Sequence, residues 1–337
     1  MGSKGQGTLD GWLSKQQSRD TAPASDSGSR PAPTPAGQRD NNTTRHRGTE
    51  RRRETLAAVA TETRIVLPDV LRDLPNIQAA KSEALYLSTL PRLKASDCPK
   101  RTPSGKAVIR IVNEDTFNAA INLAASKGPA SGRVAVLNMA SHVNPGGGWR
   151  KGALAQEEAL CYRSSLSLSL HKRYYPFKQR MGLYTPDVVV IRSDMPSGHK
   201  LLLPDIKAED LPVVSVVSIA ALRVPETRQV QETAADGTTV VRRAVYADPA
   251  ARDLTKDKMR LCLRMAAQRD HGLLVLGALG CGAFRNPKEE VAQCWLEVFG
   301  EAEFQGGWWE EVWFAVYDTR NEGNFEVFER VLGGVEV

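Results

Sequence analysis

The stretch from Asn144 to Leu170 constrains the chain most, because it sets a run of glycines close to a pair of carboxylates. An apolar run at 134–140 leads into three consecutive glycines, and seven residues then separate these from the sequence Gln-Glu-Glu. The residues of the pattern are Gly146, Gly147, Gly148, Gln156, Glu157 and Glu158. Glycines let a backbone approach a ligand closely, exposed amides bind anions, and carboxyl groups exchange protons. The stretch predicts an anion site beside a proton donor, although either half alone is also typical of a flexible turn or a solvated helix face.

A second glycine loop follows another apolar run near the C-terminus. Residues 272–277 predict a buried strand, and Pro287 suits the first position of a helix that Asn286 would cap. Between strand and helix lie Gly280, Cys281, Gly282, Ala283 and Phe284. A strand, a glycine loop and a helix start in this order form a common phosphate site. A dinucleotide-binding GxGxxG loop would need a glycine in place of Arg285, which disfavours a nicotinamide-dependent oxidoreductase.

Taken together, these motifs resemble those of the poly(ADP-ribose) glycohydrolases. Three glycines, seven residues and QEE match the signature of that family, and the flanks VLNMASHVNPGGGWRKGALAQEEALCYRSSL resemble its bacterial-type and fungal (microbial-type) branch. The second loop, GxxGCGAFxNP, resembles the pyrophosphate loop of macrodomains, whose fold the glycohydrolases contain. The resemblance covers roughly residues 54–337. It implies hydrolysis of the ribose–ribose O-glycosidic bonds of poly(ADP-ribose), releasing ADP-ribose.

The resemblance also implies roles for individual residues. Glu158 would be the catalytic acid, Glu157 would bind ribose hydroxyls, and Gln156 would shape the same corner. Phe284 would pack near the ribose at the cleaved bond; it could also be a core aromatic that locks the loop to the sheet, and both roles could hold. Further substrate contacts are implied for Asn144, Gly146, Gly147, Gly148, Gly280, Cys281, Gly282 and Ala283. We expect no metal and no cofactor.

Helix geometry separates the expected roles of the two glutamates. Neighbouring residues on an α-helix diverge by about 100°, so Glu157 and Glu158 cannot flank one bond as the paired carboxylates of ordinary glycosidases do. One acid must therefore do most of the proton transfer. The resemblance implies that this acid is Glu158, which would protonate the departing 2′-oxygen of the ribose–ribose link and then activate water as a base. A partly buried glutamate near anionic phosphates should hold its proton more readily than a free one.

The remaining sequence predicts an α/β fold, a macrodomain-like mixed sheet sandwiched by helices. Strands are expected at 108–112, 134–139, 187–192, 212–218, 272–277 and 311–316. Helices are expected at 54–74, 113–126, 156 onward, 250–269, 287–299 and 324–332. Pro68 could interrupt the first helix, alternating Ser and Leu at 165–170 favour a strand, and Asp236-Gly237 suggests a hairpin turn. Ligands of such sheets bind beyond the carboxyl ends of the strands, where both glycine loops are expected.

Residues 1–53 predict a disordered N-terminal tail ahead of a catalytic domain at 54–337. Positions 6–13 resemble the motif by which replication and repair proteins dock on the sliding clamp (PCNA), and its contacts would be Gln6, Leu9, Trp12 and Leu13. Chance matches are frequent, and an aromatic is more usual at position 13. The basic run at 45–53 fits a nuclear import signal, a nucleic-acid contact or a charged lead-in to the next helix.

Composition is compatible with a nuclear or cytoplasmic protein. The net charge of +6 is compatible with an anionic polymer as substrate. Five scattered cysteines without a CxxC pair indicate reduced thiols in the nucleus or cytoplasm, and no apolar run is long enough for a membrane span.

The resemblance leaves three function classes open. The classes are a glycohydrolase acting on polymer, a macrodomain-type hydrolase removing single ADP-ribose units from protein or DNA, and a noncatalytic ADP-ribose reader. The intact QEE disfavours the reader. Asp115 is a candidate for the adenine edge.

Overall fold

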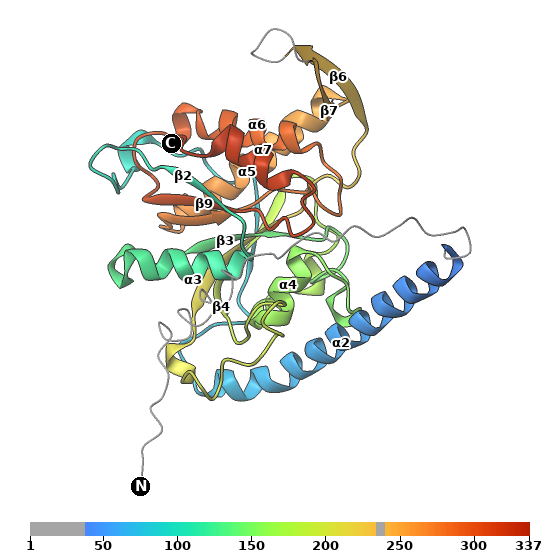
Figure 1. Cartoon of the computed structure of the whole chain (residues 1–337). Coiled ribbons are helices and arrows are strands. Elements are labelled where there is room, and N and C mark those ends of the chain that lie inside the picture. Colours follow the sequence, from blue (N-terminus) through green and yellow to red (C-terminus); the bar gives the residue numbers. More distant parts are fainter. Residues whose placement is uncertain (1–37, 234–239) are drawn as a thin grey trace, which may run out of the picture.

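A computed structural model describes residues 38–233 and 240–337, and it forms an α/β sandwich around one large sheet (Figure 1). The sheet has seven strands in the order β1-β4-β5-β3-β8-β9-β2. In that order the strands are Glu83–Tyr86, Met181–Val189, Val213–Ile219, Ala135–Met139, Leu273–Leu276, Glu311–Ala315 and Ile109–Val112. The strands from β5 to β2 pair in parallel, whereas β4 pairs antiparallel with both β5 and β1. The predicted mixed sheet is therefore confirmed.

Helices cover both faces of the sheet because its strands are apolar on both sides. The helices α5 (Pro249–Gln268), α6 (Lys288–Phe299) and α7 (Asn324–Leu332) share one core with Ala135 and Leu137 of β3. The helices α2 (Gln38–Arg72), α3 (Thr116–Lys127) and α4 (Gln156–Arg163) share a second core with Val136 of the same strand. Figure 1 shows these two helical layers above and below the sheet. Alternate residues of one strand thus face opposite cores.

Local structure departs from the sequence expectations at three places. The helix expected from about residue 54 begins at Gln38 and continues through Pro68, so residues 38–53 of the expected tail are helical. Residues Ser165–Leu168 form a 3₁₀ helix, not a strand, with the Ser164 side chain accepting from Leu166 N. Asn286 does not cap α6; Pro287 is the residue before the helix, and it makes no side-chain cap. The clamp-like motif at 6–13 lies outside the described residues.

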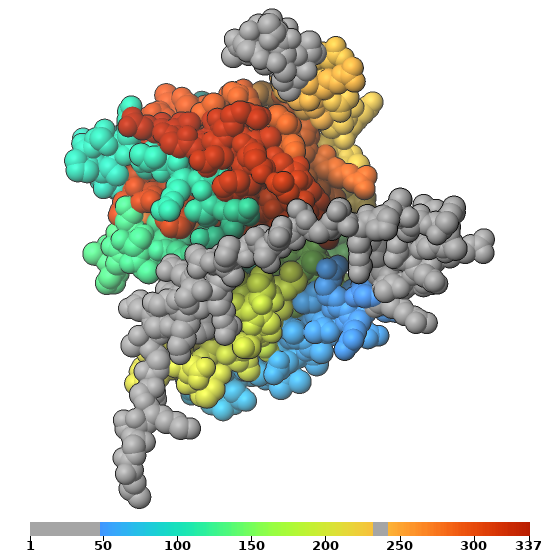
Figure 2. Space-filling model, in the orientation of Figure 1, coloured from blue at the N-terminus to red at the C-terminus, as the bar shows by residue number. Residues whose placement is uncertain are grey.

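A two-stranded antiparallel hairpin stands out from the body of the molecule (Figure 2). Its strands are β6 (Thr227–Thr233) and β7 (Val240–Tyr246), paired from Thr227↔Tyr246 to Thr233↔Val240. The hairpin predicted around this segment is thus present, and its Asp236-Gly237 turn lies outside the described residues. The base of the hairpin is attached close to the second glycine loop, because Val224 N donates to Phe284 O.

Candidate active site

The sheet brings the two glycine loops to one edge. Strands β3 and β8 are parallel neighbours with Ala135↔Leu274 and Val136↔Val275 in register, so their carboxyl ends meet there. The first loop leaves β3 and the second leaves β8. Contact between the two is direct: the rings of His142 and Phe284 lie 6.1 Å apart, edge to face. This edge is where ligands of open α/β sheets bind.

The glycines of the first loop are required by its internal packing. Gly146 and Gly147 have φ values of 69° and 59°, which favour glycine. A Cβ at Gly146 would lie 2.8 Å from Trp149 Cδ1, and a Cβ at Gly147 would collide with the Glu158 carboxylate and lie 3.3 Å from Glu157 Oε2. Both carboxylates therefore lie against this loop, although they are neighbours on α4.

Gln156 joins the start of α4 to the end of β3. Its Nε2 donates to Leu137 O at 2.7 Å and to Thr116 Oγ1 at 3.2 Å, and its Oε1 accepts from Met139 N at 2.9 Å. Both ends of the amide are engaged with the protein. Gln156 therefore fixes the helix that carries the two glutamates, which agrees with its expected part in shaping this corner.

Glu157 faces the protein interior and is 2% exposed. Its Oε2 accepts from Ser141 N at 2.7 Å, and its Oε1 lies 3.4 Å from Asn138 Nδ2. Burial, opposed by the Ser141 hydrogen bond and reinforced by the charge of Glu158, raises the pKa of Glu157 to about 8. The raised pKa favours the protonated form of Glu157 near neutral pH.

Glu158 is more accessible than its neighbour, with 8% of its surface exposed. Its Oε1 accepts a hydrogen bond from Gly148 N at 2.9 Å. This bond fixes the carboxylate against the first loop through a backbone amide, which no side-chain substitution removes. Glu158 is thus held at the loop that is expected to receive the anion.

The second loop is built around the Asn286 side chain. Its Nδ2 donates to Leu222 O at 2.7 Å and to Gly280 O at 3.1 Å, while its Oδ1 accepts from Tyr246 O–H at 2.9 Å. Gly280 has a φ of 76°, and a Cβ there would lie 2.5 Å from Asn286 Nδ2. A Cβ at Gly282 would meet nothing within 4 Å. Gly280 is therefore required by the packing of the loop, whereas Gly282 borders open space.

Comparison with known proteins agrees with this geometry. A family model described as "Microbial-type PARG, catalytic domain" matches residues 49–193, which include the first loop and both glutamates. Solved structures of poly(ADP-ribose) glycohydrolase (PARG) are similar over most of the chain. That from Thermomonospora curvata is 25% identical with a TM-score of 0.63, covering 82% of this chain and 99% of its own. The chain is thus similar to the microbial-type PARG family, in sequence over residues 49–193 and in structure over most of its length.

Several of the similar structures contain a ligand. The T. curvata glycohydrolase bound to the inhibitor ADP-HPD is 25% identical with a TM-score of 0.61, over 82% of this chain and 99% of that one. The Deinococcus radiodurans glycohydrolase in complex with ADP-ribose is 28% identical with a TM-score of 0.56, over 74% of this chain and 94% of that one. No curated protein sequence matches the chain. The matched catalytic domain is that of a glycohydrolase family, which identifies the protein as a glycoside hydrolase.

The other expected contact residues lie at the same edge of this PARG fold. Asn144 is exposed, and its carbonyl accepts from Gly147 N at 2.9 Å. Cys281 and Phe284 are half-buried, and Ala283 is exposed. Phe284 belongs to neither of the two large cores and packs against His142 instead. The ring of Phe284 thus lies between the two loops, and its suggested contact with ribose stays a prediction.

A buried polar network supports the site from behind. Arg163, at the end of α4, is fully buried and pairs with Asp115, which also caps α3 by accepting from Phe117 N at 2.8 Å. Arg163 further donates to Asn118 Oδ1 at 2.8 Å and to Arg192 O at 3.1 Å. Asp115 Oδ1 is thus engaged with the protein, and its suggested contact with adenine stays a prediction.

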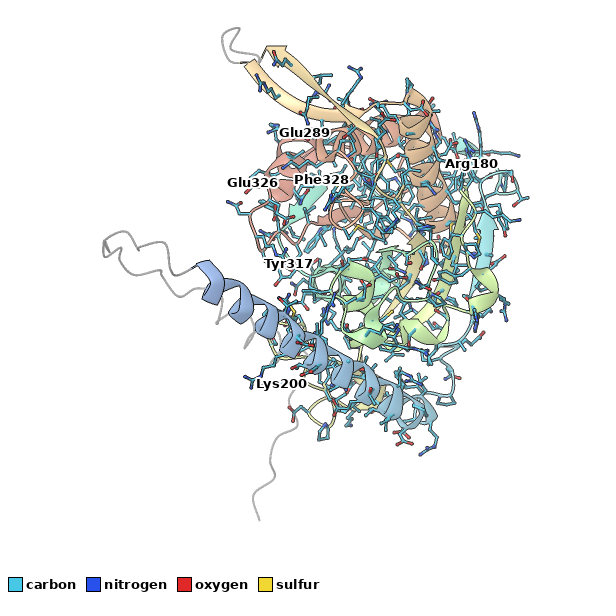
Figure 3. The ribbon with its side chains drawn as sticks, turned by 90° about the vertical axis from the view of Figure 1, so that its right-hand side faces the viewer. Arg180, Lys200, Glu289, Tyr317, Glu326 and Phe328 are labelled. Atoms are coloured by element: carbon cyan, nitrogen blue, oxygen red, sulfur yellow. The ribbon has the colours of Figure 1, made fainter. Side chains whose placement is uncertain are left out.

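Four residues at this edge were not singled out from the sequence. Asn138 and Ser141 hold Glu157, and His142 contacts Phe284. Tyr317, 43% exposed, follows β9 at the same edge of the sheet (Figure 3). A polar Asn138 inside an otherwise apolar strand was a usable signal, because a polar side chain in a buried strand requires a partner. The others follow strands by one to three residues and carry no motif.

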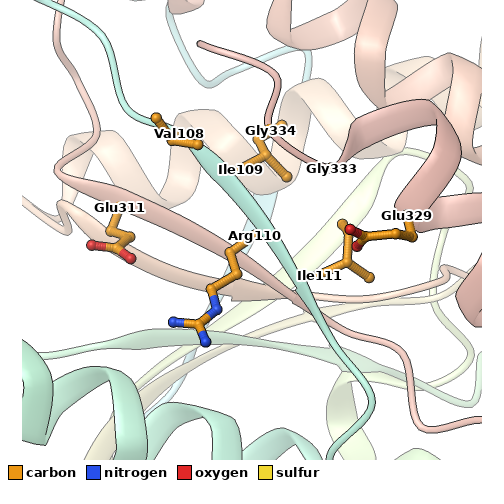
Figure 4. A pocket seen from close by; sticks show the side chains of 8 residues that line it. All are labelled: Val108, Ile109, Arg110, Ile111, Glu311, Glu329, Gly333 and Gly334. Atoms are coloured by element: carbon orange, nitrogen blue, oxygen red, sulfur yellow. The ribbon is translucent and has the colours of Figure 1, made fainter.

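A cavity of about 320 Å³ lies elsewhere, along the edge strand β2 (Figure 4). It is lined by Val108, Ile109, Arg110, Ile111, Glu311, Glu329, Gly333 and Gly334. None of these belongs to a glycine loop, so this cavity is separate from the active site. Within residues 38–233 and 240–337 there is no cluster of three metal-ligating side chains and no helix long and apolar enough to cross a bilayer.

Proposed function

We propose that this PARG-like hydrolase releases ADP-ribose from poly(ADP-ribose) with Glu158 as its general acid and base. The observation that carries the proposal is the contact of both carboxylates with the first glycine loop, with Glu158 as the more accessible of the two. The ADP-ribose complex of the D. radiodurans relative supports the ligand class. The pyrophosphate would lie between the two loops, where backbone amides and the open space at Gly282 can receive it.

In the proposed reaction, Glu158 gives its proton to the 2′-oxygen of the neighbouring unit while the C1″–O bond breaks. The resulting oxocarbenium-like ribose is stabilised by the adjacent pyrophosphate. A water molecule then loses its proton to Glu158 and adds to C1″, which restores the acid. An arriving pyrophosphate favours protonation of the carboxyl pair, because nearby negative charge raises the pKa of a carboxyl group.

Glu157 has a different part in this proposal. Its two oxygens are held by Asn138 and Ser141, so the side chain is preorganised to receive ribose hydroxyls on the remaining lone pairs. Tyr317, an exposed aromatic beyond β9, is our candidate for stacking against adenine.

The test is to incubate the protein with labelled polymer, with mono-ADP-ribosylated protein and with mono-ADP-ribosylated DNA. We expect release of ADP-ribose from polymer at a rate well above that from either mono-modified substrate. Faster release from a mono-modified substrate would assign the protein to the second class, a hydrolase of single ADP-ribose units. Binding of ADP-ribose without release from any substrate would assign the protein to the third class, a noncatalytic ADP-ribose reader.

We also propose that the 6–13 motif binds a sliding clamp (PCNA), which would place the protein in the nucleus, at sites of DNA damage response. The support is an apolar set, Leu9, Trp12 and Leu13, in a polar sequence. Trp12→Ala with Leu13→Ala should abolish clamp binding in calorimetry, because buried anchors each contribute on the order of 2 kcal/mol. Hydrolysis of free polymer should not change. A wild-type peptide of residues 4–15 that shows no saturable binding would sink the idea.

A further inference from the structure

Four cations surround the outer side of the first glycine loop. Arg150 and Lys151 follow the loop directly, in the 3₁₀ turn η4 (Trp149–Lys151), and both are exposed. Arg52 and Arg53 of α2 are also exposed. The two segments touch, since a Cβ on Gly152 would lie 2.7 Å from Arg53 Cα. We call these four residues the basic rim.

Helical spacing directs the two arginines of α2 toward the loop. Leu56 of α2 is buried in the same core as Trp149, so this face of α2 packs on the first loop. Arg52 and Arg53 precede Leu56 by four and three residues, which places them on that face, one turn earlier. Glu50 and Glu54 fall on other faces of the helix. The positive charge of this turn is therefore concentrated beside the loop.

The four cations are not used by the fold. Ion pairs occupy other cations of the described chain, such as Arg163 with Asp115 and Arg192 with Glu62. Within the same described ranges, no ion pair involves Arg52, Arg53, Arg150 or Lys151. Exposed charges of one sign without partners raise the local concentration of anions. The basic rim thus has free capacity for phosphate.

We propose that the basic rim binds the part of a poly(ADP-ribose) chain that lies beyond the cleaved bond, an inference that rests on the proposed function. The oxygen that Glu158 protonates belongs to the rest of the chain, so that chain starts within hydrogen-bond reach of Glu158. Gly148, which holds Glu158 through its amide, directly precedes η4. Each further unit of the polymer carries a pyrophosphate. The first pyrophosphate beyond the cleaved bond contacts the basic rim where the chain leaves the active site.

This geometry favours the polymer over a DNA duplex as the occupant. The basic rim directly adjoins the first glycine loop, so one polymer chain can bind the rim and the active site at the same time. Binding at two connected sites raises the overall affinity for the polymer. A DNA duplex has no end that enters the catalytic site and would gain only the charge contacts.

The experiment compares long polymer with a dimer of ADP-ribose units, whose single leaving unit reaches less of the rim. The variant Arg52→Gln with Arg53→Gln changes no residue of either loop and keeps good helix formers in α2. We expect kcat/KM for long polymer to fall about ten-fold at low salt and the value for the dimer, which presents a single pyrophosphate to the rim, to fall less. Adding Arg150→Gln and Lys151→Gln should deepen the loss and reduce the salt slope of polymer binding by about 0.7 per cation.

A matched control removes two exposed cations at the far end of α2. Arg72→Gln with Lys207→Gln changes the net charge equally, and Arg72 lies about 28 Å from Arg53 along the helix at 1.5 Å per residue. This control should leave polymer turnover unchanged. An equal loss in the control and the rim variant would overturn the proposal, because the effect would then come from net charge alone.

Binding to the Glu158→Gln protein separates the rim from the reaction. If no substrate is hydrolysed by the wild type, the proposed function fails, and titration of long polymer still reports on the rim. Tighter binding of long polymer than of ADP-ribose, lost in the Arg52→Gln and Arg53→Gln background, supports the rim. Duplex DNA and unlabelled polymer, at equal phosphate concentration, are then compared as competitors of bound long polymer. Equal competition by the two would overturn the proposal that the rim binds polymer.

Discussion

The two glycine loops look alike in sequence but use their glycines for different reasons. In the first loop, side chains at Gly146 and Gly147 would run into Trp149 and Glu158, groups of the protein itself. In the second loop, Gly280 is required by Asn286, whereas Gly282 borders open space. The first loop is therefore a rigid support for carboxylates. The second loop leaves open space at Gly282 for a ligand. A glycine-rich sequence alone therefore does not show whether its glycines are required by internal packing or by a bound ligand.

Removal of the acid held by the first loop should have the largest effect. Glu158→Gln preserves size and can still accept from Gly148 N, but it cannot deliver a proton. We expect single-turnover hydrolysis of polymer to slow by about 10²–10⁴, the usual share of general acid catalysis. ADP-ribose affinity should stay within a few-fold in calorimetry. Release of ADP-ribose at near wild-type rate would show that another group supplies the proton.

A side chain in the first loop should act through Glu158. Gly147→Ala places a methyl group against the Glu158 carboxylate at a φ of 59°, so the carboxylate must move. We expect a rate loss of about 10², because small misplacements of catalytic groups are costly. Gly334→Ala is the matched control, with a φ of 76° and nothing within 4 Å of its Cβ. Equal activity of the two variants would contradict a supporting role for the first loop.

A side chain in the second loop should affect the ligand and not the fold. Gly282→Val projects into open space, so we expect an unchanged melting temperature and an ADP-ribose affinity weaker by about ten-fold or more. Gly280→Ala should instead lower the melting temperature, since its Cβ would approach Asn286 and Ala221. Unchanged ADP-ribose affinity in a folded Gly282→Val protein would exclude a close approach of the ligand at this position.

The smallest effect on rate is expected at Glu157, with a gain in stability. Its pKa is raised to about 8 from an ordinary value of 4.5, so the folded state binds more protons than the unfolded state between these values. Stability should fall as pH rises through this window. Glu157→Gln should remove that slope and stabilise the fold by about 1–3 kcal/mol at pH 8, because it replaces a buried carboxyl group that ionises in this range with a neutral amide.

Urea unfolding between pH 5 and pH 8.5 measures this slope. Substrate affinity of Glu157→Gln should fall more than its rate, because hydroxyl contacts exist already in the ground state. A wild-type protein whose stability rises over this pH range would show that Glu157 ionises normally in the fold.

The sequence by itself determined the family resemblance, the alternation of strands and helices, and the two glycine loops, the first of them with its two glutamates. Each of these rests on local pattern: apolar runs of strand length, glycines in a row, and polar residues at fixed spacing. Local pattern was misleading at 165–170, where Ser164 caps a 3₁₀ turn, and at Asn286, whose side chain is used within the loop and not by the helix.

Only the tertiary structure decided what each residue in the site does. Parallel pairing of β3 with β8 brings the two loops together, and that pairing joins residues far apart in the chain. Burial raises the pKa of Glu157, although Glu157 and Glu158 are the same residue type at adjacent positions. The packing of α2 on η4 sets a basic run from the N-terminal region beside the catalytic loop. The burial of a residue and the groups around it are properties of the assembled fold. For that reason the sequence could identify these residues but could not show the environment that sets their chemical properties.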